Sequence, residues 1–418
     1  MSAPLTLAHC RDLDARDALA PLRDRFILPD GIIYLDGNSL GALPRETEAR
    51  VRDVITRQWG GDLIKSWNKH DWIGLPRRVG AKIAKLIGAR DHEVVVADST
   101  SLNVFKALHA ALAHRPGRRV ILSDDGNFPT DLYMAQGLAE LLDDKHELIV
   151  VPSDQIAQAL SDDVAVLMLT EVNYRTGRRH DMKALTMAAH EAGALVLWDL
   201  AHSAGAFPVD INGCDADFAV GCGYKYLNGG PGAPAFIFVA DRWQGAATQP
   251  LFGWMGHDAP FAFDLDYRPR GGPGDSIGRF LVGTPPILSL VALESGLDQF
   301  AGVDMAAAQR KSIALGDLFI ALVEQELAGH GLALASPRDG AMRGSQVSFR
   351  HPEGYPIMQA LIDRGVIGDF RAPDILRFGF TPLYVRFEDA WAAVQHLRAV
   401  MVEQAWQRPE FRRRAAVT

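Results

Sequence analysis

The sequence has few cysteines, no long apolar run and no excess of basic residues. Its three cysteines, Cys10, Cys214 and Cys222, fit neither a disulfide framework nor a metal site, so we expect a reduced, cytoplasmic protein. Runs such as VAVLML are too short to cross a bilayer, and the start lacks the features of a signal peptide. With a net charge of −8 and one basic run near the end, which is typical of a solvated tail, nucleic acid is not an expected partner.

What the sequence does contain is typical of a globular protein, with 48% hydrophobic and 22% charged residues in a chain of 418. Apolar stretches of strand length alternate with helical patterns in the middle of the chain. This alternation predicts an α/β fold in which a mainly parallel sheet is sandwiched by helices. The stretches lie at residues 120–125, 147–152, 164–172, 194–201, 217–225 and 233–240.

After about residue 295 the pattern changes to one long helical stretch, followed by short strands mixed with helices. This change predicts a smaller α+β domain at the C-terminal end. We therefore expect an N-terminal segment (1–60), a large domain (61–295) and a small C-terminal domain (296–418).

Polar residues follow two neighbouring strands at the point where each strand ends. Asp199 lies in the apolar stretch LVLWDLA, and Lys225 ends the next stretch, within GCGYKYLNGG. A buried carboxylate requires a partner, and a desolvated lysine can form a Schiff base with an aldehyde. Together they fit pyridoxal phosphate, with Lys225 on the aldehyde carbon and Asp199 on the ring nitrogen. The alternative for Lys225 is an ordinary lysine that extends to solvent from a strand end.

The glycines around Lys225 are expected to let the backbone leave the sheet and to give the lysine side chain room to swing. His202, three residues after Asp199, fits either a contact with the cofactor or substrate or an ordinary buried histidine.

Two further segments suit the rest of such a cofactor. In DSTSLNVFK, Thr100 and Ser101 precede a helical run, where backbone N–H groups favour a phosphate; a plain helix cap is the alternative. In NFPTD, Phe128 fits either stacking on the cofactor ring or a place in the core. Asp131 in the same motif fits either a helix cap or a contact that supports the site residues. Arg377 lies within the apolar stretch ILRFGF, and a buried arginine needs a carboxylate partner. We expect Arg377 either to bind a substrate carboxylate or to form an internal salt bridge.

These motifs together resemble the kynureninase family, pyridoxal phosphate enzymes of the aspartate aminotransferase fold type that are similar to class V aminotransferases. The resemblance covers nearly the whole chain. It is carried by IYLDGNSLGALP, SWN, DSTSLNVFK, FPTD, NYRTG, WDLAHSAGA, GYKYLNGGPG, FGWMGH, GTPPI and LRFGFTPLY.

The resemblance implies a role for each matching residue. Lys225 is expected to be the Schiff-base lysine, Asp199 the partner of the ring nitrogen and Tyr224 an acid or base. Arg377 is the expected clamp for the substrate carboxylate, with Trp67 and Asn38 beside the substrate. Expected cofactor contacts are Thr100, Ser101, Phe128, Pro129, Thr130, Asp131, Thr170, Asp199, His202, Tyr224, Lys225, Trp254 and Thr284.

The implied assembly is a homodimer with a shared active site, to which Trp254 and Thr284 come from the neighbouring subunit. The implied reaction is the hydrolysis of L-kynurenine to anthranilate and L-alanine, in tryptophan catabolism and pyridine nucleotide biosynthesis. 3-Hydroxykynurenine is the other candidate substrate; the choice depends on residues near the ring such as Trp67, His202 and Thr284, and a bulky Trp67 favours the unhydroxylated ring.

Other activities remain open on the same fold, namely selenocysteine lyase or aminotransferase. A cysteine desulfurase is disfavoured because it needs a nucleophilic cysteine well after the lysine, and Cys222 is the last in the chain. A binding protein without catalysis is disfavoured because Lys225, Asp199 and Arg377 are all present. A dinucleotide-dependent dehydrogenase would need a GxGxxG turn, which the strand ends lack.

Overall fold

The computed structural model describes residues 4–143, 145–272 and 274–414. The chain folds into two compact units. We call Glu46–Asn173 with His180–Asp298 the central unit, and Met1–Arg45 with Tyr174–Arg179 and Gln299–Thr418 the terminal unit. The predicted domain limits near residues 60 and 295 stay a prediction, because compact packing alone does not define independently folding domains.

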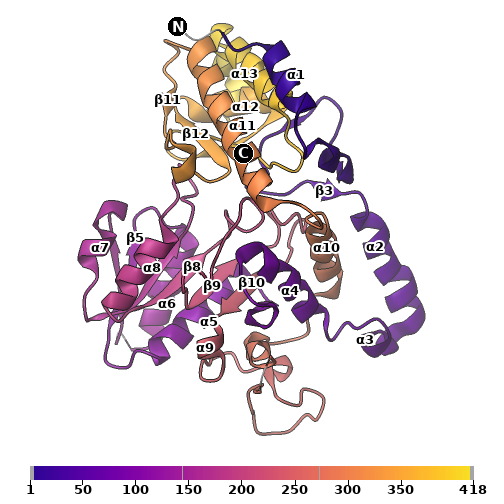
Figure 1. Cartoon of the computed structure of the whole chain (residues 1–418), viewed down its shortest axis with the longest axis vertical. Helices are drawn as coiled ribbons and strands as arrows, with labels where there is room; N and C mark the ends of the chain where they lie inside the picture. Colours follow the sequence, from indigo (N-terminus) through magenta and orange to yellow (C-terminus); the bar gives the residue numbers. More distant parts are fainter. Residues whose placement is uncertain (1–3, 144, 273, 415–418) are drawn as a thin grey trace. The chain divides into compact units, whose positions relative to one another are not determined.

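The central unit is built on a sheet of seven strands in the described part of the chain, ordered β4-β10-β9-β8-β7-β5-β6 (Figure 1). Neighbours from β9 to β6 pair in parallel, whereas β10 is antiparallel to both β9 and β4. The predicted mainly parallel α/β fold is therefore confirmed. The strands are β4 (Val94–Val96), β5 (Val120–Asp124), β6 (Glu147–Val151), β7 (Val164–Thr170), β8 (Leu195–Asp199), β9 (Phe218–Gly221) and β10 (Phe236–Val239).

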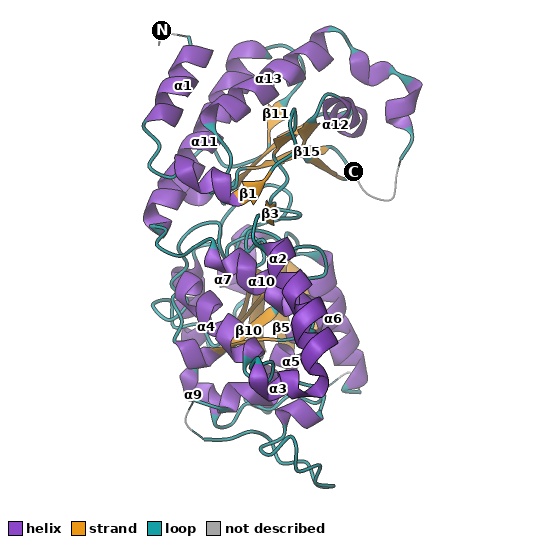
Figure 2. Cartoon of the chain, turned by 90° about the vertical axis from the view of Figure 1, so that its right-hand side faces the viewer, coloured by secondary structure: helices purple, strands orange, loops and turns teal. Residues whose placement is uncertain are grey.

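Helices surround the strands of this sheet within the central unit (Figure 2). Helix α5 packs against β7, β8, β9 and β10, and its buried Ala107, Ala110 and Ala111 allow a close approach to the strands. The helices are α2 (Thr47–Asp53), α3 (Ser66–Lys69), α4 (Leu75–Ile87), α5 (Thr100–Ala113), α6 (Pro129–Leu141), α7 (Ile156–Ala159), α8 (Met182–Glu191), α9 (Asp241–Gln244) and α10 (Ile287–Asp298).

The terminal unit contains an antiparallel sheet with the order β11-β12-β15-β14. Phe319 of α11 packs against Phe349, Phe378 and Phe380, which forms the aromatic part of its core. This mixture of strands and helices matches the predicted α+β character. Its elements are α1 (Leu7–Ala15), β1 (Phe26–Ile27), β2 (Ile33–Tyr34), β3 (Leu43–Pro44), α11 (Met305–Glu326), β11 (Ala333–Leu334), β12 (Gln346–Arg350), α12 (Gly354–Asp363), β13 (Val366–Ile367), β14 (Asp369–Arg371), β15 (Ile375–Gly379) and α13 (Phe387–Val402).

The sheet of the central unit determines where the predicted site residues lie. Strands β4, β7, β8 and β9 run in the same direction, so their carboxyl ends share one edge of the sheet. Thr170 and Asp199 end β7 and β8, and α5 begins shortly after β4. Ligands of open α/β sheets bind at this edge. No helix in the described residues is long and apolar enough to span a membrane.

Candidate active site

Lys225 lies in a closed loop after β9. The Gly229 N–H donates to Gly223 O at 2.9 Å, and the Asn228 N–H donates to Lys225 O at 3.0 Å. A Cβ atom on Gly223 would lie 2.5 Å from Pro234 O, and one on Gly229 would lie 2.7 Å from Gly223 O. These two glycines therefore serve close packing rather than backbone freedom, in contrast to the role expected for them from the sequence.

Three side chains surround the Lys225 ammonium group. Its Nζ lies 2.9 Å from His202 Nε2, 5.9 Å from the centre of the Phe128 ring and 6.0 Å from that of Tyr224. Phe128 is 40% exposed, so it is not an ordinary core residue. His202 is buried, and its ring faces the lysine. The structure thus brings four of the predicted site residues together.

Asp199 and Asp131 form a buried carboxyl pair beside this lysine. Their side chains hydrogen-bond to each other, and Thr170 bonds to the same pair. Burial, followed by the charge of Asp199, raises the pKa of Asp131 well above its usual range. Burial also raises the pKa of Asp199, which the Lys225 charge and the Ala201 N–H oppose. Both shifts favour a carboxyl pair that keeps one proton over a pair in which both groups are ionised.

The carboxyl pair fits a cationic ring nitrogen. Asp131 Oδ2 is buried and has no hydrogen-bond partner among the described residues. A buried negative charge with an unpaired oxygen nearby favours a protonated partner. The residues present therefore fit pyridoxal phosphate, with Asp199 at the ring nitrogen.

Asn127 supports this pair and was not among the predicted site residues. It is buried, its Nδ2 donates to Ser123 Oγ at 2.9 Å, and its Oδ1 accepts from the Thr170 hydroxyl. The signal in the sequence was its position just before FPTD, but its contacts reach β5 and β7, which no local pattern reveals.

The proposed phosphate cradle lies at the start of α5. Ser99 is the N-cap and accepts from the Leu102 N–H, so Thr100 and Ser101 occupy the first turn, where backbone N–H groups lack partners within the helix. Because α5 follows β4, this turn lies at the sheet edge that carries Asp199. Pro129 and Thr130 begin α6 directly after Phe128.

The remaining predicted residues of the central unit lie apart from these contacts. Trp67 is in α3 and meets Trp72 edge-on at 6.0 Å. Trp254 packs against Phe261 and Phe263 in the long loop that protrudes from the unit, the salmon-coloured segment in Figure 1. Thr284 is exposed. No described contact joins these three residues to Lys225 within one chain.

Arg377 lies in the terminal unit, in the middle of β15, and only 1% of its surface is exposed. It stands directly opposite Asp369 on β14, and its Nε donates to Asp369 Oδ1 at 2.7 Å. Its Nη2 bonds to Asp369 and Ser39, and its Nη1 donates to Tyr174 O at 2.6 Å. When the oxygen and nitrogen of the Asn38 side-chain amide are exchanged, the oxygen accepts a hydrogen bond from Arg377 Nε at 2.9 Å. The internal salt bridge considered from the sequence is therefore present, and Asn38 adjoins it.

Asp36 completes the group around Arg377. Burial, followed by the charge of Asp369, raises the pKa of Asp36 to about 7, against the opposing charge of Arg377. Its Oδ1 is buried without a partner among the described residues. Neither Asp36 nor Asp369 was predicted as a site residue, although the hairpin register pairs Asp369 with Arg377.

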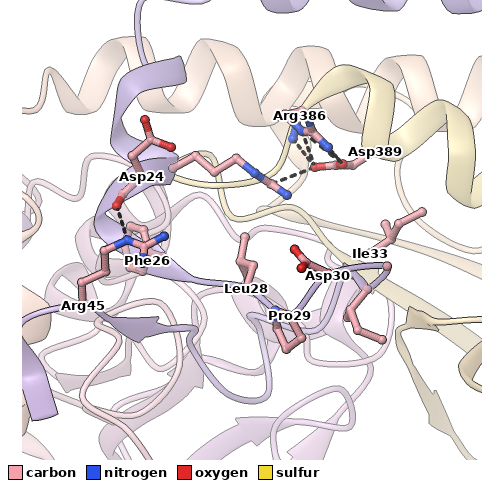
Figure 3. Close-up of a pocket in the computed structure, with 12 residues that line it drawn as sticks. Asp24, Phe26, Leu28, Pro29, Asp30, Ile33, Arg45, Arg386 and Asp389 are labelled. Atoms are coloured by element: carbon pink, nitrogen blue, oxygen red, sulfur yellow. Dashed lines mark hydrogen bonds and ion pairs between the residues drawn. The ribbon is translucent and has the colours of Figure 1, made fainter.

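The terminal unit also has a cavity of about 430 Å³ (Figure 3). Arg23 and Arg386 both bind Asp389, and Arg45 donates to Asp24 O. Its arginines are thus engaged by the chain itself, and none of its lining residues is a predicted site residue.

Comparison with solved structures shows which known fold the chain has. The fold matches a C-DES variant with glycine covalently linked to its pyridoxal phosphate cofactor (TM-score 0.76, 17% identity, 90% of this chain and 98% of that one). It also matches the cysteine desulfurase CsdA from Escherichia coli (TM-score 0.74, 21% identity, 92% and 98%). The chain thus has the fold of the class V-like pyridoxal phosphate enzymes.

Comparison of sequences defines the family. The chain is 58% identical to a kynureninase of Burkholderia mallei (strain SAVP1) over 412 residues, 97% of this chain and 98% of the relative. It is 55% identical to a kynureninase of Pseudomonas fluorescens over 418 residues, 99% and 100% of the two chains. The model of the kynureninase C-terminal domain matches residues 308–397. The chain belongs to the kynureninase family, which confirms the resemblance found in the sequence.

Proposed function

We propose that this protein is a pyridoxal-phosphate-dependent hydrolase that cleaves L-kynurenine to anthranilate and L-alanine. The observation that carries the proposal is the high identity to kynureninases along the whole chain, with Lys225, Asp199 and Arg377 all in place. The reaction belongs to tryptophan catabolism and leads toward pyridine nucleotides.

The residues of the central unit provide the cofactor site. Lys225 is proposed as the covalent attachment point, Asp199 as the partner of the ring nitrogen, and Phe128 as the residue that stacks on the ring. Further proposed contacts from the same chain are Thr100, Ser101, Pro129, Thr130, Asp131, Thr170, His202 and Tyr224. When bound, the cofactor supplies an electron sink for the carbanions at the α and β positions of the substrate.

Proton transfer is assigned to Lys225 and Tyr224. Lys225 would remove the α-proton of the bound substrate, and His202, whose Nε2 lies 2.9 Å from Lys225 Nζ, would hold the amino group in position. Cys222 and burial raise the pKa of Tyr224, so its hydroxyl stays protonated near neutral pH. Tyr224, whose ring centre lies 6.0 Å from Lys225 Nζ, is proposed as the acid or base when the bond between the β-carbon and the ketone carbon breaks.

Arg377 is proposed to bind the substrate carboxylate. The chain already uses four of its five N–H groups, and one N–H of Nη1 has no partner among the described residues. The guanidinium is thus held rigidly by Asp369, Ser39 and Tyr174, and a carboxylate that binds at Nη1 adopts one orientation.

We also propose that the active protein is a homodimer in which Trp254 and Thr284 act in the neighbouring subunit's site. This proposal is supported by the protruding loop, on which Phe252, Phe261, Phe263 and Leu265 are more than half exposed. An exposed apolar cluster of this kind is typical of an interaction surface. The three unpaired cysteines support a reducing, cytoplasmic location.

The substrate assignment is tested by measuring kcat/KM for four amino acids, L-kynurenine, 3-hydroxy-L-kynurenine, L-selenocysteine and L-cysteine. We expect L-kynurenine to be preferred, because a tryptophan at the position proposed for Trp67, beside the substrate ring, would crowd a ring hydroxyl. A clear preference for the hydroxylated substrate would refute only the proposed role of Trp67 and would leave the proposed function intact. A preference for selenocysteine would refute the proposed function.

A further inference from the structure

Lys106 is a buried cation to which neither the sequence motifs nor the proposed mechanism assigns a role. It lies on α5, and its side chain has 0% exposed surface. Its Nζ donates to Asp98 Oδ2 at 2.7 Å and to Phe280 O at 2.7 Å. Burial lowers the pKa of Lys106, and the charge of Asp98 opposes this shift. Because burying an ammonium group is costly, its two partners indicate what the lysine holds in place.

The first partner, Asp98, forms the turn that leads into α5. Its φ of 49° lies in the left-handed region, which is uncommon for residues other than glycine, although aspartate adopts it more readily than most. Its carbonyl accepts from the Ala235 N–H at 2.9 Å, and the next residue, Ser99, is the N-cap of α5. The bond from Lys106 to the Asp98 carboxylate therefore fixes the direction of the first turn of α5, which carries Thr100 and Ser101.

The second partner, Phe280 O, belongs to a different segment. Phe280 is fully buried at the end of the 3-10 helix Ser276–Phe280, four residues before Thr284. One ammonium group thus joins the turn before Thr100 to the segment that leads to Thr284. Both ends of this link carry proposed contacts for the cofactor.

We propose that Lys106 is a positioning residue for the phosphate-binding part of the cofactor site. It holds the Asp98 turn so that the first N–H groups of α5 meet the phosphate, and it holds the Phe280 segment so that Thr284 reaches its proposed position in the partner's site. The inference rests on the proposed function, because it requires that a phosphorylated cofactor binds at α5.

The test compares two ligands that differ only in the phosphate. Pyridoxal phosphate and pyridoxal are titrated into cofactor-free wild-type protein and into Lys106→Met, a change that removes the charge but keeps much of the side-chain length. We expect the affinity for pyridoxal phosphate to fall about tenfold or more, whereas the affinity for pyridoxal stays within about twofold. The ratio of the two affinities is a quantity that a general loss of stability does not change.

Lys311→Met is the matched control. Lys311 is also buried and also binds one aspartate, Asp17 at 2.7 Å, but it lies on α11 in the terminal unit. Both variants are expected to unfold at a lower temperature than the wild type. Only Lys106→Met is expected to lose the preference for the phosphorylated ligand.

Asp98→Asn provides a second variant if Lys106→Met does not fold. It keeps the bond from Lys106 to Phe280 O and weakens only the hold on the turn, so a smaller loss of the same preference is expected. An unchanged ratio of affinities in the variants that fold would overturn the role of Lys106. A wild-type protein that bound neither ligand would instead refute the proposed function, and with it this inference.

Discussion

At the scale of single residues, the account depends on Lys225 as the attachment point of the cofactor. Lys225→Ala is expected to lose the visible absorbance of the bound cofactor and all turnover of kynurenine, because no other group can take its place in the covalent link. Circular dichroism should show an unchanged fold. Lys85→Ala, on the exposed side of α4, is the control and should keep full activity. If Lys225→Ala turned over kynurenine at the wild-type rate, this result would contradict the assignment.

Arg377→Lys tests the proposed carboxylate clamp. Lysine keeps the charge but cannot bind Asp369 and a substrate carboxylate at once, so KM for L-kynurenine should rise about tenfold or more with a smaller effect on kcat. As a control, the substrate-like amine that lacks the α-carboxylate should inhibit wild type and variant equally. An unchanged KM would show that Arg377 serves only its internal salt bridge.

Asp36 makes folding stability depend on pH. Its pKa in the folded protein is raised to about 7 from the ordinary value of 3.8, so the folded chain binds a proton that the unfolded chain has lost. This stabilisation is fully present below the ordinary pKa and is lost as the pH rises to about 7. The groups that face the Asp36 carboxyl are Asp369, Arg371, Arg377, Ser39, Tyr34 and Tyr384.

Asp36→Asn removes this titration. Relative to wild type, the variant should be more stable at pH 8 than at pH 5, measured as the free energy of unfolding in urea at both values. A difference between the two proteins that does not change with pH would show that Asp36 has an ordinary pKa.

The sequence predicted those residues whose charge stands out against an apolar stretch. Lys225, Asp199 and Arg377 are charged groups within apolar stretches, which is why they stand out. Asn127 and Asp369 could not be found in this way, because their partners come from other strands. Lys106 was missed because a single lysine in a helical pattern is typical of a solvated position, and only the tertiary packing buries it.

At the scale of elements, strands β5 to β10 follow the predicted apolar stretches, whereas β4 was not predicted because Val94–Val96 is too short a run. The sequence at residues 45–59 is helical in character. The structure has α2 followed by a π-helix at Val54–Asp62, a distinction that hydrophobic periodicity does not make.

Gly223→Ala tests the closed loop that carries Lys225. The added Cβ would lie 2.5 Å from Pro234 O and 2.9 Å from Leu293 Cδ2, so we expect a loss of about 1–3 kcal/mol in stability and weaker cofactor binding. Gly137→Ala is the control. No atom lies within 4 Å of its added Cβ on α6, and it should stabilise the protein by about 0.5–1 kcal/mol. Equal cofactor affinity in both variants would contradict the packing role of Gly223.

At the scale of the whole molecule, the proposed shared site makes two inactive variants complementary. Lys225→Ala is mixed with the double variant Trp254→Ala/Thr284→Ala under conditions that let subunits exchange. Half of the dimers are then hybrids with one intact site, so about a quarter of the wild-type activity should return. Each variant treated alone in the same way is the control. No recovery despite exchange of subunits would place all site residues within one chain.

The central claim is that this chain hydrolyses L-kynurenine at the bond between its β-carbon and its ketone carbon. The most direct measurement incubates the pyridoxal-phosphate-loaded protein with L-kynurenine and quantifies substrate, anthranilate and alanine over time. The account predicts that anthranilate and alanine appear in equal amounts as the substrate disappears. Loaded protein that leaves kynurenine unchanged, or converts it to other products, would contradict the claim.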